Sequence, residues 1–224
     1  MEEYKIKIQK NKIDFNIKNQ IIELIKKENR ESILSNLSDK ILFEYLDIVV
    51  NSKFIYLFTL KKENSLVAYA LLSNKPSYLI SEFSQLKTKI ILNLILKFKF
   101  FTIFNLIISF FKIDLIKLDK KNLKIVSENL NLNLIAVKEI FQSKGVGSYF
   151  IKNILDHFKN KPGFEYITCE TYRKRAINFY VEKCNFVILG KKLRIFKNLT
   201  ILSYKIWLGL FNLLLYFFNK FFNQ

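Results

Sequence analysis

Residues 134–148, LIAVKEIFQSKGVGS, carry the most informative pattern in the chain. The apolar run that begins at Leu130 predicts a strand, and the apolar spacing after Ser148 predicts a helix. The turn between them contains Gly145 and Gly147. Glycine lets a backbone approach a ligand closely, and a helix N-terminus offers unpaired N–H groups at the positive end of its dipole. This turn suits a pyrophosphate, although a tight turn without a ligand would need similar glycines.

The segments around this turn predict a mixture of strands and helices. Alternating or β-rich runs predict strands over 4–9, 54–60, 66–72, 130–137 and 166–172, and a final hairpin made of 186–189 and 193–196. Helical spacing and start signals predict helices over 17–30, from 39 onward, from 148 onward and over 175–183. The order of these elements indicates an α/β (α+β) fold.

Two motifs resemble those of the GNAT N-acetyltransferase family. Leu134 to Gly147 is similar to the family's acetyl-CoA-binding motif, and Ala176 to Phe186, AINFYVEKCNF, is similar to its second motif, A-x-x-x-Y-x-x-x-G-F. The resemblance covers most of residues 1–197. It implies a GNAT-like mixed, mostly antiparallel splayed sheet flanked by helices, and acyl transfer from acetyl-CoA, as co-substrate, to an amine.

The resemblance also assigns roles to individual residues. It implies that Ile135, Ala136 and Val137 pair their backbone with the pantetheine arm. The residues that it assigns to the pyrophosphate turn are Gln142, Ser143, Lys144, Gly145, Val146, Gly147 and Ser148. Arg173, which begins a basic cluster with Lys174 and Arg175, is expected at the CoA phosphates or on a solvated face. Tyr180 matches the tyrosine that protonates the leaving thiolate, and a phenol with a pKa of about 10 keeps its proton at neutral pH.

The general base is the weakest part of this resemblance. Asn131 stands where several family members carry a glutamate. Glu128 and Glu139 are the candidate bases, Glu170 is a further carboxylate nearby, and a base that acts through a water is the alternative. Asn185 replaces the glycine of the second motif, a mild change because asparagine tolerates a left-handed backbone.

Two apolar segments lie outside the resemblance. We expect an apolar helical insertion at about 86–118 and an apolar amphipathic C-terminal helix over 198–224, which places the acyltransferase domain at 1–197. Lysines interrupt or flank both segments, as is typical of helices at an anionic membrane surface. A membrane span or packing on the domain are alternatives for the tail, and a dimerisation hairpin is the alternative for the insertion.

Charge and cysteine content limit the classes of binding partner and metal site that we expect. Lys+Arg number 37 against 19 Asp+Glu, a net charge of +18 that indicates an anionic partner, or a bias toward A/T-rich codons. No RNA-binding motif is present, so nucleic acid is not expected. Cys169, Cys184 and the single His157 form no zinc pattern, so we predict no metal. The N-terminus has no secretory signal pattern.

These features predict a transferase peripheral on the cytoplasmic face of a membrane. Its acceptor would be a small-molecule or lipid-linked amine such as an amino sugar, and a homodimer is compatible with the sequence. A transferase for protein N-termini or ribosomal proteins is one alternative. A non-catalytic lipid- or RNA-binding protein on the same fold is the other.

Overall fold

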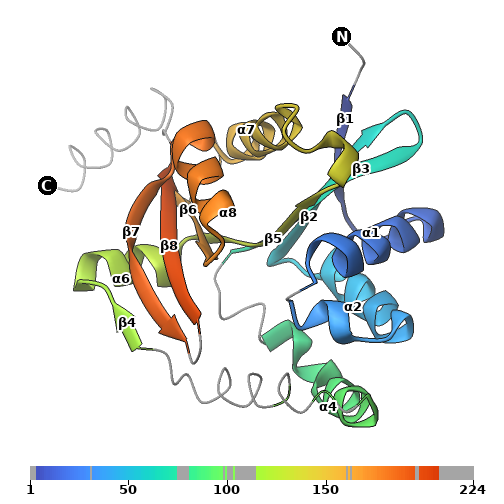
Figure 1. Ribbon diagram of the computed structural model, residues 1–224. Coiled ribbons are helices and arrows are strands. Elements are labelled where there is room, and N and C mark those ends of the chain that lie inside the picture. Colours follow the sequence, from blue (N-terminus) through green and yellow to red (C-terminus); the bar gives the residue numbers. More distant parts are fainter. Residues whose placement is uncertain are drawn as a thin grey trace, which may run out of the picture.

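The sheet of this protein has eight strands in the order β1-β2-β3-β5-β6-β8-β7-β4, with helices on both faces (Figure 1). The computed structural model describes residues 4–30, 32–74, 81–97, 99, 103, 115–159, 161, 163–194 and 197–206. The strands are β1 (Tyr4–Gln9), β2 (Ile55–Lys62), β3 (Ser65–Ser73), β4 (Leu115–Lys117), β5 (Leu130–Val137), β6 (Tyr166–Thr171), β7 (Val187–Arg194) and β8 (Lys197–Lys205). Neighbouring strands are antiparallel except β5 and β6, which are parallel.

Six helices and four short turns accompany these strands in the described residues. The helices are α1 (Phe15–Glu28), α2 (Asp39–Asn51), α4 (Lys87–Leu96), α6 (Lys120–Glu128), α7 (Val146–Phe158) and α8 (Lys174–Asn178). The turns are η1 (Leu34–Asn36), η2 (Phe83–Leu86), η3 (Glu139–Phe141) and η4 (Phe179–Lys183), of which η4 is π-helical.

Helices α1 and α2 cover one face of the sheet (Figure 1). In α1, Ile17, Ile21 and Ile25 recur at four-residue steps and are buried, as expected for an amphipathic helix. The Asp14 carboxylate caps the first turn by accepting from the backbone N–H of Asn16 at 2.8 Å. The resulting core includes side chains of β3 and β5, so α1 is held against the middle of the sheet.

Helix α7 covers the other face together with α8 and η4 (Figure 1). Phe150, Ile154 and Phe158 are buried at four-residue steps against strands β2, β3, β5 and β6. The sheet thus separates two apolar cores. A ligand between β5 and β6 would be flanked by both.

The parallel pair β5 and β6 stays together over a short length only. Leu130 pairs with Ile167 and Leu132 pairs with Cys169, after which the pairing ends. Strand β5 continues to Val137 and stays paired with β3 on its other side. Figure 1 shows the two strands diverging, with α7 and α8 at the wide end of the gap.

The structure confirms the predicted fold class and most elements. It shows the strand at 4–9, the β2–β3 hairpin, the strands at 130–137 and 166–171, and the helix that follows the glycine turn. Strand β4 and helix α6 were not predicted. The predicted hairpin of 186–189 and 193–196 is wrong, because β7 runs unbroken through this region and its hairpin partner is β8.

The predicted helix over 198–224 is wrong at its start. Residues 198–205 belong to β8, which lies between β6 and β7, so the sheet extends beyond the predicted domain boundary at 197. Consecutive residues from Leu199 to Ser203 are buried, so their burial has no period that separates strand from helix, and pairing partners 29 to 39 positions away on β6 decide the outcome. The remainder of this prediction, 207–224, lies outside the described residues.

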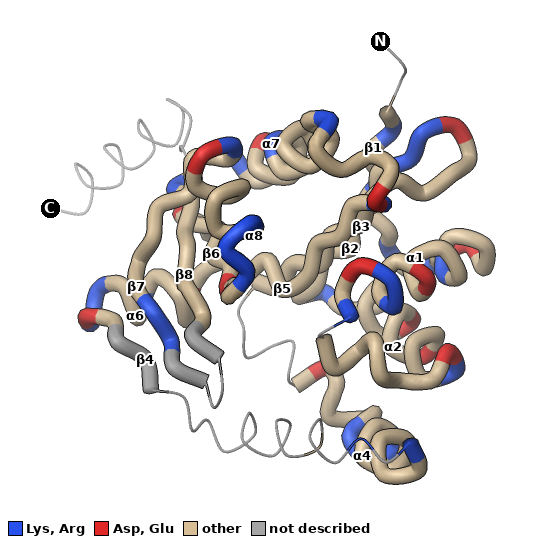
Figure 2. The backbone as a smooth tube through the Cα atoms, in the orientation of Figure 1, with Lys and Arg blue, Asp and Glu red and all other residues tan. Residues whose placement is uncertain are grey.

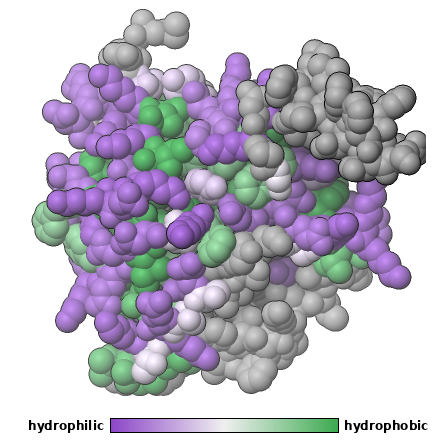
Figure 3. Space-filling model, turned by 180° about the vertical axis from the view of Figure 1, so that it is seen from behind, coloured by the Kyte–Doolittle hydropathy of each residue, from purple (hydrophilic) through white to green (hydrophobic). Residues whose placement is uncertain are grey.

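The predicted insertion is partly helical and partly strand. Helix α4 lies near its start, buries Leu94 and exposes Leu92, Ile95 and Leu96, whereas β4 at its end pairs with β7. Most of 98–114 lies outside the described residues. Among the helices that are described, none has the length and apolar character needed to cross a bilayer. Seen from behind, the described surface is mostly hydrophilic with separate hydrophobic patches (Figure 3).

Candidate functional site

The second half of β5 has one open edge. The backbone N–H of Lys138 donates to Val67 O at 2.9 Å, and Ala136 pairs with Tyr69 in the same register. Because hydrogen-bonding direction alternates along an antiparallel strand, the backbone groups of Ile135 and Val137 point away from β3, into the gap toward β6. The predicted pantetheine strand therefore presents two N–H groups to that gap.

Side-chain amides donate hydrogen bonds to the backbone carbonyl oxygens on the same edge of β5. Gln142 Nε2 donates to Val137 O at 2.9 Å and to Glu28 Oε2 at 2.9 Å. Asn29 Nδ2 donates to Ile135 O at 3.4 Å. The Gln142 side chain thus joins the start of the glycine turn to the end of β5 and to the end of α1.

The turn after η3 has the geometry of an anion cradle. Ser143 and Gly145 have positive φ angles of 60° and 78°, and α7 begins at Val146. A Cβ atom placed on Gly145 would meet nothing within 4 Å, so the space in front of it is open. The first N–H groups of α7 have no intrahelical acceptor and lie at the positive end of a helix of 13 residues. These residues fit a pyrophosphate.

Gly147 has a different role in the structure. A Cβ atom there would lie 3.2 Å from Cζ of Phe179 and 3.9 Å from Cγ2 of Val137. This glycine therefore lets η4 pack against the first turn of α7. Ser148, also assigned to the cofactor by resemblance, lies beside the thiol of Cys184 and offsets part of the rise that burial causes in the pKa of that thiol. Packing accounts for the glycine at position 147, and the role of Ser148 stays a prediction.

Arginine reaches the glycine turn from α8. Arg175 Nη2 donates to Ser143 Oγ at 3.1 Å, and the Lys and Arg residues at the start of α8 lie beside the gap in Figure 2. Arg173, the residue expected at the phosphates, is the N-cap of α8, and its backbone N–H donates to Thr171 Oγ1 at 3.3 Å. Lys144 is exposed on the turn itself. The structure thus brings Arg175 into contact with the turn.

Tyr180 lies in η4, in the core on the α7 side of the sheet. Its side chain is buried and its ring contacts the ring of Phe186 at 5.1 Å between centroids. Burial, with smaller contributions from Cys169 and Cys184, raises the pKa of the Tyr180 phenol well above its ordinary value. Cys169 forms the last pair with Leu132 before β5 and β6 part. The predicted acid therefore holds its proton close to the point where the gap begins.

The other face of the sheet carries a buried polar row at the same level. Asn131 Nδ2 donates to Thr168 Oγ1 at 3.1 Å, and Asn133 Nδ2 donates to Ser73 Oγ at 2.9 Å. Register shifts between Leu71 and Leu72 of β3, so Asn133 is an extra residue in β5. Sequence reasoning noted Asn131 alone. The other polar residues of this row could have been found in the sequence, because they occur at alternate positions of otherwise apolar strands.

The predicted bases lie at opposite ends of β5. Glu128 precedes the strand and pairs with Lys124 at 3.9 Å, and Glu139 follows it and pairs with Lys27 at 3.4 Å. The 8 residues of β5 span about 25 Å, so at most one of the two lies near Tyr180.

Glu170 lies nearer the polar row. It is two residues from Thr168 on β6, so the two side chains share a face of the sheet. Lys192 Nζ is 3.5 Å from Glu170 Oε1. The side chain of Glu170 is 26% exposed, compared with 71% for that of Glu139.

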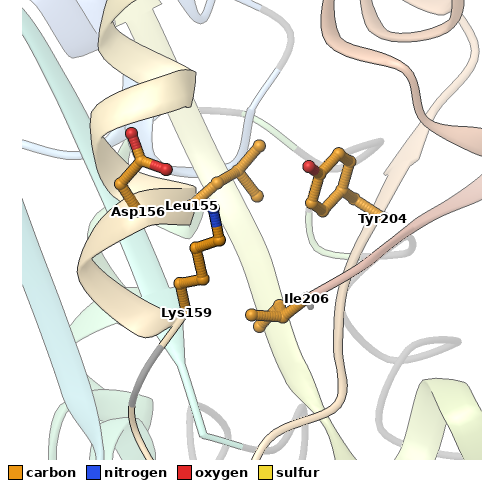
Figure 4. Close-up of a pocket in the computed structure, with 5 residues that line it drawn as sticks. All are labelled: Leu155, Asp156, Lys159, Tyr204 and Ile206. Carbon is orange, nitrogen blue, oxygen red and sulfur yellow. The ribbon is translucent and has the colours of Figure 1, made fainter. Parts of the chain in front are cut away.

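A small pocket lies away from this site. Its volume is about 90 Å³, and Figure 4 shows its lining residues, Leu155, Asp156, Lys159, Tyr204 and Ile206. They come from the C-terminal end of α7 and the end of β8, roughly 20 Å along the helix from the glycine turn. The described residues contain no cluster of three or more His, Cys, Asp or Glu side chains that could hold a metal ion.

Comparisons with known proteins agree with this geometry. Residues 112–186 match the model of the acetyltransferase (GNAT) family. No curated protein matches the chain in sequence. A probable acetyltransferase from Staphylococcus epidermidis has a TM-score of 0.54 at 14% identity, with 91% of this chain and 99% of that one covered.

Two further solved structures carry more specific names. The ribosomal-protein-S18-alanine N-acetyltransferase from Escherichia coli has a TM-score of 0.51 at 12% identity, covering 92% of this chain and 96% of that one. Arabidopsis thaliana NAA60 in complex with acetyl-CoA has a TM-score of 0.51 at 12% identity, covering 91% and 99%. Identities this low show a shared fold. The chain thus has the fold of the GNAT acetyltransferases, and its residues 112–186 carry the sequence signature of that family, which confirms the resemblance found in the sequence.

Proposed function

We propose that this protein transfers the acetyl group of acetyl-CoA to a primary amine. The observation that carries the proposal is the open edge of β5. Its free N–H groups at Ile135 and Val137 lead directly into the left-handed turn at Gly145 and the N-terminus of α7. An extended arm that ends in a pyrophosphate matches a strand edge that ends at an anion cradle. Bound acetyl-CoA would supply the thioester.

The residues around the gap divide the proposed work between binding and proton transfer. Ile135 and Val137 bind amide groups of the arm through their backbone, and Arg175 adds charge at the phosphates. The amine nitrogen attacks the thioester carbonyl carbon, and the C–S bond breaks. Tyr180 donates its proton to the departing sulfur, and because burial raises the pKa of the phenol, that proton is present at neutral pH.

The amine must lose a proton before or during its attack. The polar row of Asn131 and Thr168 lies on the face opposite Tyr180, so we place the approaching amine there. Glu170 is a carboxylate on that face, two residues from Thr168, and we assign it the proton, passed through a water. Base and acid then act on opposite sides of the reacting carbon.

The amino group of a protein N-terminus is a second candidate acceptor. Its support is the fold shared with the ribosomal-protein-S18-alanine N-acetyltransferase. The amino-sugar acceptor at a membrane stays a prediction from the sequence, since the comparisons do not point to it and most of the apolar tail lies outside the described residues.

Calorimetry with acetyl-CoA tests the binding half of the proposal. Gly145→Asp keeps the left-handed backbone that aspartate tolerates and places a negative charge in the cradle. We expect it to weaken acetyl-CoA binding by at least about tenfold. Gly163→Asp is the matched control, since Gly163 also has a positive φ, 96°, and open space around its Cβ position. Equal effects of the two substitutions would contradict the role of the glycine turn as an anion cradle. A wild type that does not bind acetyl-CoA would contradict the proposed function.

Transfer is tested by mass spectrometry with pooled amines. The pool contains short peptides with free Ala, Ser or Met N-termini, polyamines and glucosamine. Acetylation of any member supports the transferase. A protein that binds acetyl-CoA and acetylates none of them contradicts it. Which member is acetylated separates peptide from small-molecule acceptors.

A further inference from the structure

The two backbone carbonyls at the open edge of β5 are each covered by a side-chain amide. Asn29 Nδ2 donates to Ile135 O at 3.4 Å, and Gln142 Nε2 donates to Val137 O at 2.9 Å. The backbone N–H groups of Ile135 and Val137 have no acceptor in the described part of the chain. A strand edge ordinarily offers donors and acceptors in alternation. On this edge, the groups without a partner are donors only.

The amide of Asn29 is held with its nitrogen toward β5. Its Oδ1 accepts from the hydroxyl of Tyr69 at 2.7 Å. Tyr69 is buried, and burial raises the pKa of its phenol well above the ordinary value, so the hydroxyl keeps its proton and can donate. Ile135 O can only accept, so the amide nitrogen must face it. The hydroxyl and the carbonyl together fix the orientation of Asn29.

The amide of Gln142 is fixed in a similar way by Glu28, the last residue of α1. Glu28 Oε2 accepts from Gln142 Nε2 at 2.9 Å, and Val137 O accepts from the same nitrogen. Both N–H groups of this amide are therefore committed. The other carboxylate oxygen of Glu28, Oε1, is buried and has no hydrogen-bond partner in the described part of the chain. Gln142 is thus the donor that orients this carboxylate.

Both covered carbonyls depend on the end of helix α1. Asn29, the C-cap of α1, is 106 positions from Ile135 in the chain, and Glu28 is 114 positions from Gln142. Packing places them there, because α1 shares an apolar core with Ala136 of β5. A helix far away in the sequence therefore decides which backbone groups of this edge are left for a ligand.

We propose that Asn29 is a positioning residue for acetyl-CoA, which covers Ile135 O so that the open edge binds the pantetheine arm through N–H donors alone. The inference rests on the proposed function, because acetyl-CoA must bind at this edge. The arm contains two amides, each with a carbonyl acceptor and an N–H donor. Its carbonyl oxygens suit the N–H groups of Ile135 and Val137, which lie about 7 Å apart along the strand. Its N–H groups meet covered carbonyls and form no hydrogen bond with the edge.

The test compares acetyl-CoA with two analogues, in each of which an ester oxygen replaces one amide N–H of the arm. The replacement keeps the carbonyl and removes the donor. Asn29→Asp places an oxygen where the amide nitrogen covers Ile135 O and keeps an acceptor for Tyr69, so Ile135 O can accept from the arm. We expect the preference for acetyl-CoA over one of the analogues, measured by calorimetry, to rise by about three- to tenfold in this variant, the value of one hydrogen bond. The added charge cancels in this ratio, because all three ligands carry the same charge.

The controls and outcomes separate this inference from the function on which it rests. Asn16→Asp adds the same charge at an exposed position of α1 and should leave the ratio as in the wild type. Thermal unfolding checks the fold of each variant, and Asn29→Ala replaces Asn29→Asp in the comparison if the latter does not fold. A ratio equal to that of the wild type overturns the role of Asn29 and leaves acetyl-CoA binding intact. A wild type that does not bind acetyl-CoA overturns both this inference and the proposed function.

Discussion

The two halves of β5 belong to one strand and have different surroundings. Asn131 and Leu132 lie between β3 and β6 and are in register with both strands. On the β6 side, Ile135 and Val137 pair with no strand in the described part of the chain, because β6 has turned away, and only their carbonyl oxygens accept, from the side-chain amides of Asn29 and Gln142. One strand thus serves as sheet interior at its start and as a binding edge at its end.

This difference shows how a sheet makes a site without a conventional pocket. The free N–H groups come from ordinary strand geometry, and the divergence of a neighbour exposes them. The glycine turn and α7 then continue the same edge into an anion cradle. The pocket in Figure 4 lies elsewhere, between the C-terminal end of α7 and the end of β8.

Proline substitutions in the two halves should have the most unequal effects. Leu132→Pro removes a ladder hydrogen bond, whichever neighbour that bond faces, and should destabilise the fold by about 3 kcal/mol or more. Val137→Pro removes an N–H that points into the gap, so the protein should stay folded and bind acetyl-CoA about three- to tenfold more weakly. Urea unfolding and calorimetry measure the pair. Similar stability losses in both would show that Val137 is paired within the sheet.

Replacing the acid should affect catalysis but not the edge. Tyr180→Phe keeps the buried ring and removes the proton donor, so kcat should fall by about 10² to 10⁴-fold while acetyl-CoA binding is retained. Because burial raises the pKa of the phenol, wild-type Tyr180 stays protonated at neutral pH, and its activity is lost only as pH rises through that raised pKa. A pH–rate profile of both proteins checks this. A wild-type decline near neutral pH that vanishes in Tyr180→Phe would contradict it.

A substitution at Gly147 tests how tightly η4 packs against the first turn of α7. Gly147→Val places carbon atoms against the ring of Phe179, where even a Cβ atom would be 3.2 Å away, and should cost about 1–3 kcal/mol of stability. Phe179→Leu in the same chain should restore most of that loss. Urea unfolding of the single and double variants gives the coupling. Additive losses would mean that another neighbour limits space at Gly147.

The smallest expected effect is on acetyl-CoA binding, and it distinguishes the two arginines beside the glycine turn. Arg175→Ala removes an exposed contact with Ser143 and should weaken acetyl-CoA binding by roughly threefold, less at high salt because exposed charges are screened. Arg173→Ala, at the N-cap of α8, should change binding less. Calorimetry at two salt concentrations measures both. A larger effect at Arg173 would restore the original prediction from the motif.

Part of the fold could be predicted because its signals are local. The alternation of 4–9 and the hairpin at 54–72 depend on residues next to one another, and each forms as predicted. The prediction for 198–205 was wrong because this strand is buried on both faces, so polar and apolar residues do not alternate there in the way that marks a strand with one exposed face. Their identity depends on pairing with β6 and β7, which no neighbouring residue reveals.

The candidate site divides in the same way. The sequence alone determined the glycine turn, the helix that follows it and the place of Tyr180, since glycine conformation and motif spacing act within a few residues. Only the tertiary structure decided that β6 leaves β5, that Arg175 reaches the turn, and that Glu28 keeps an oxygen without a partner. Those facts join segments far apart in the chain. Their energies come from packing and hydrogen bonds that exist only after the chain has folded.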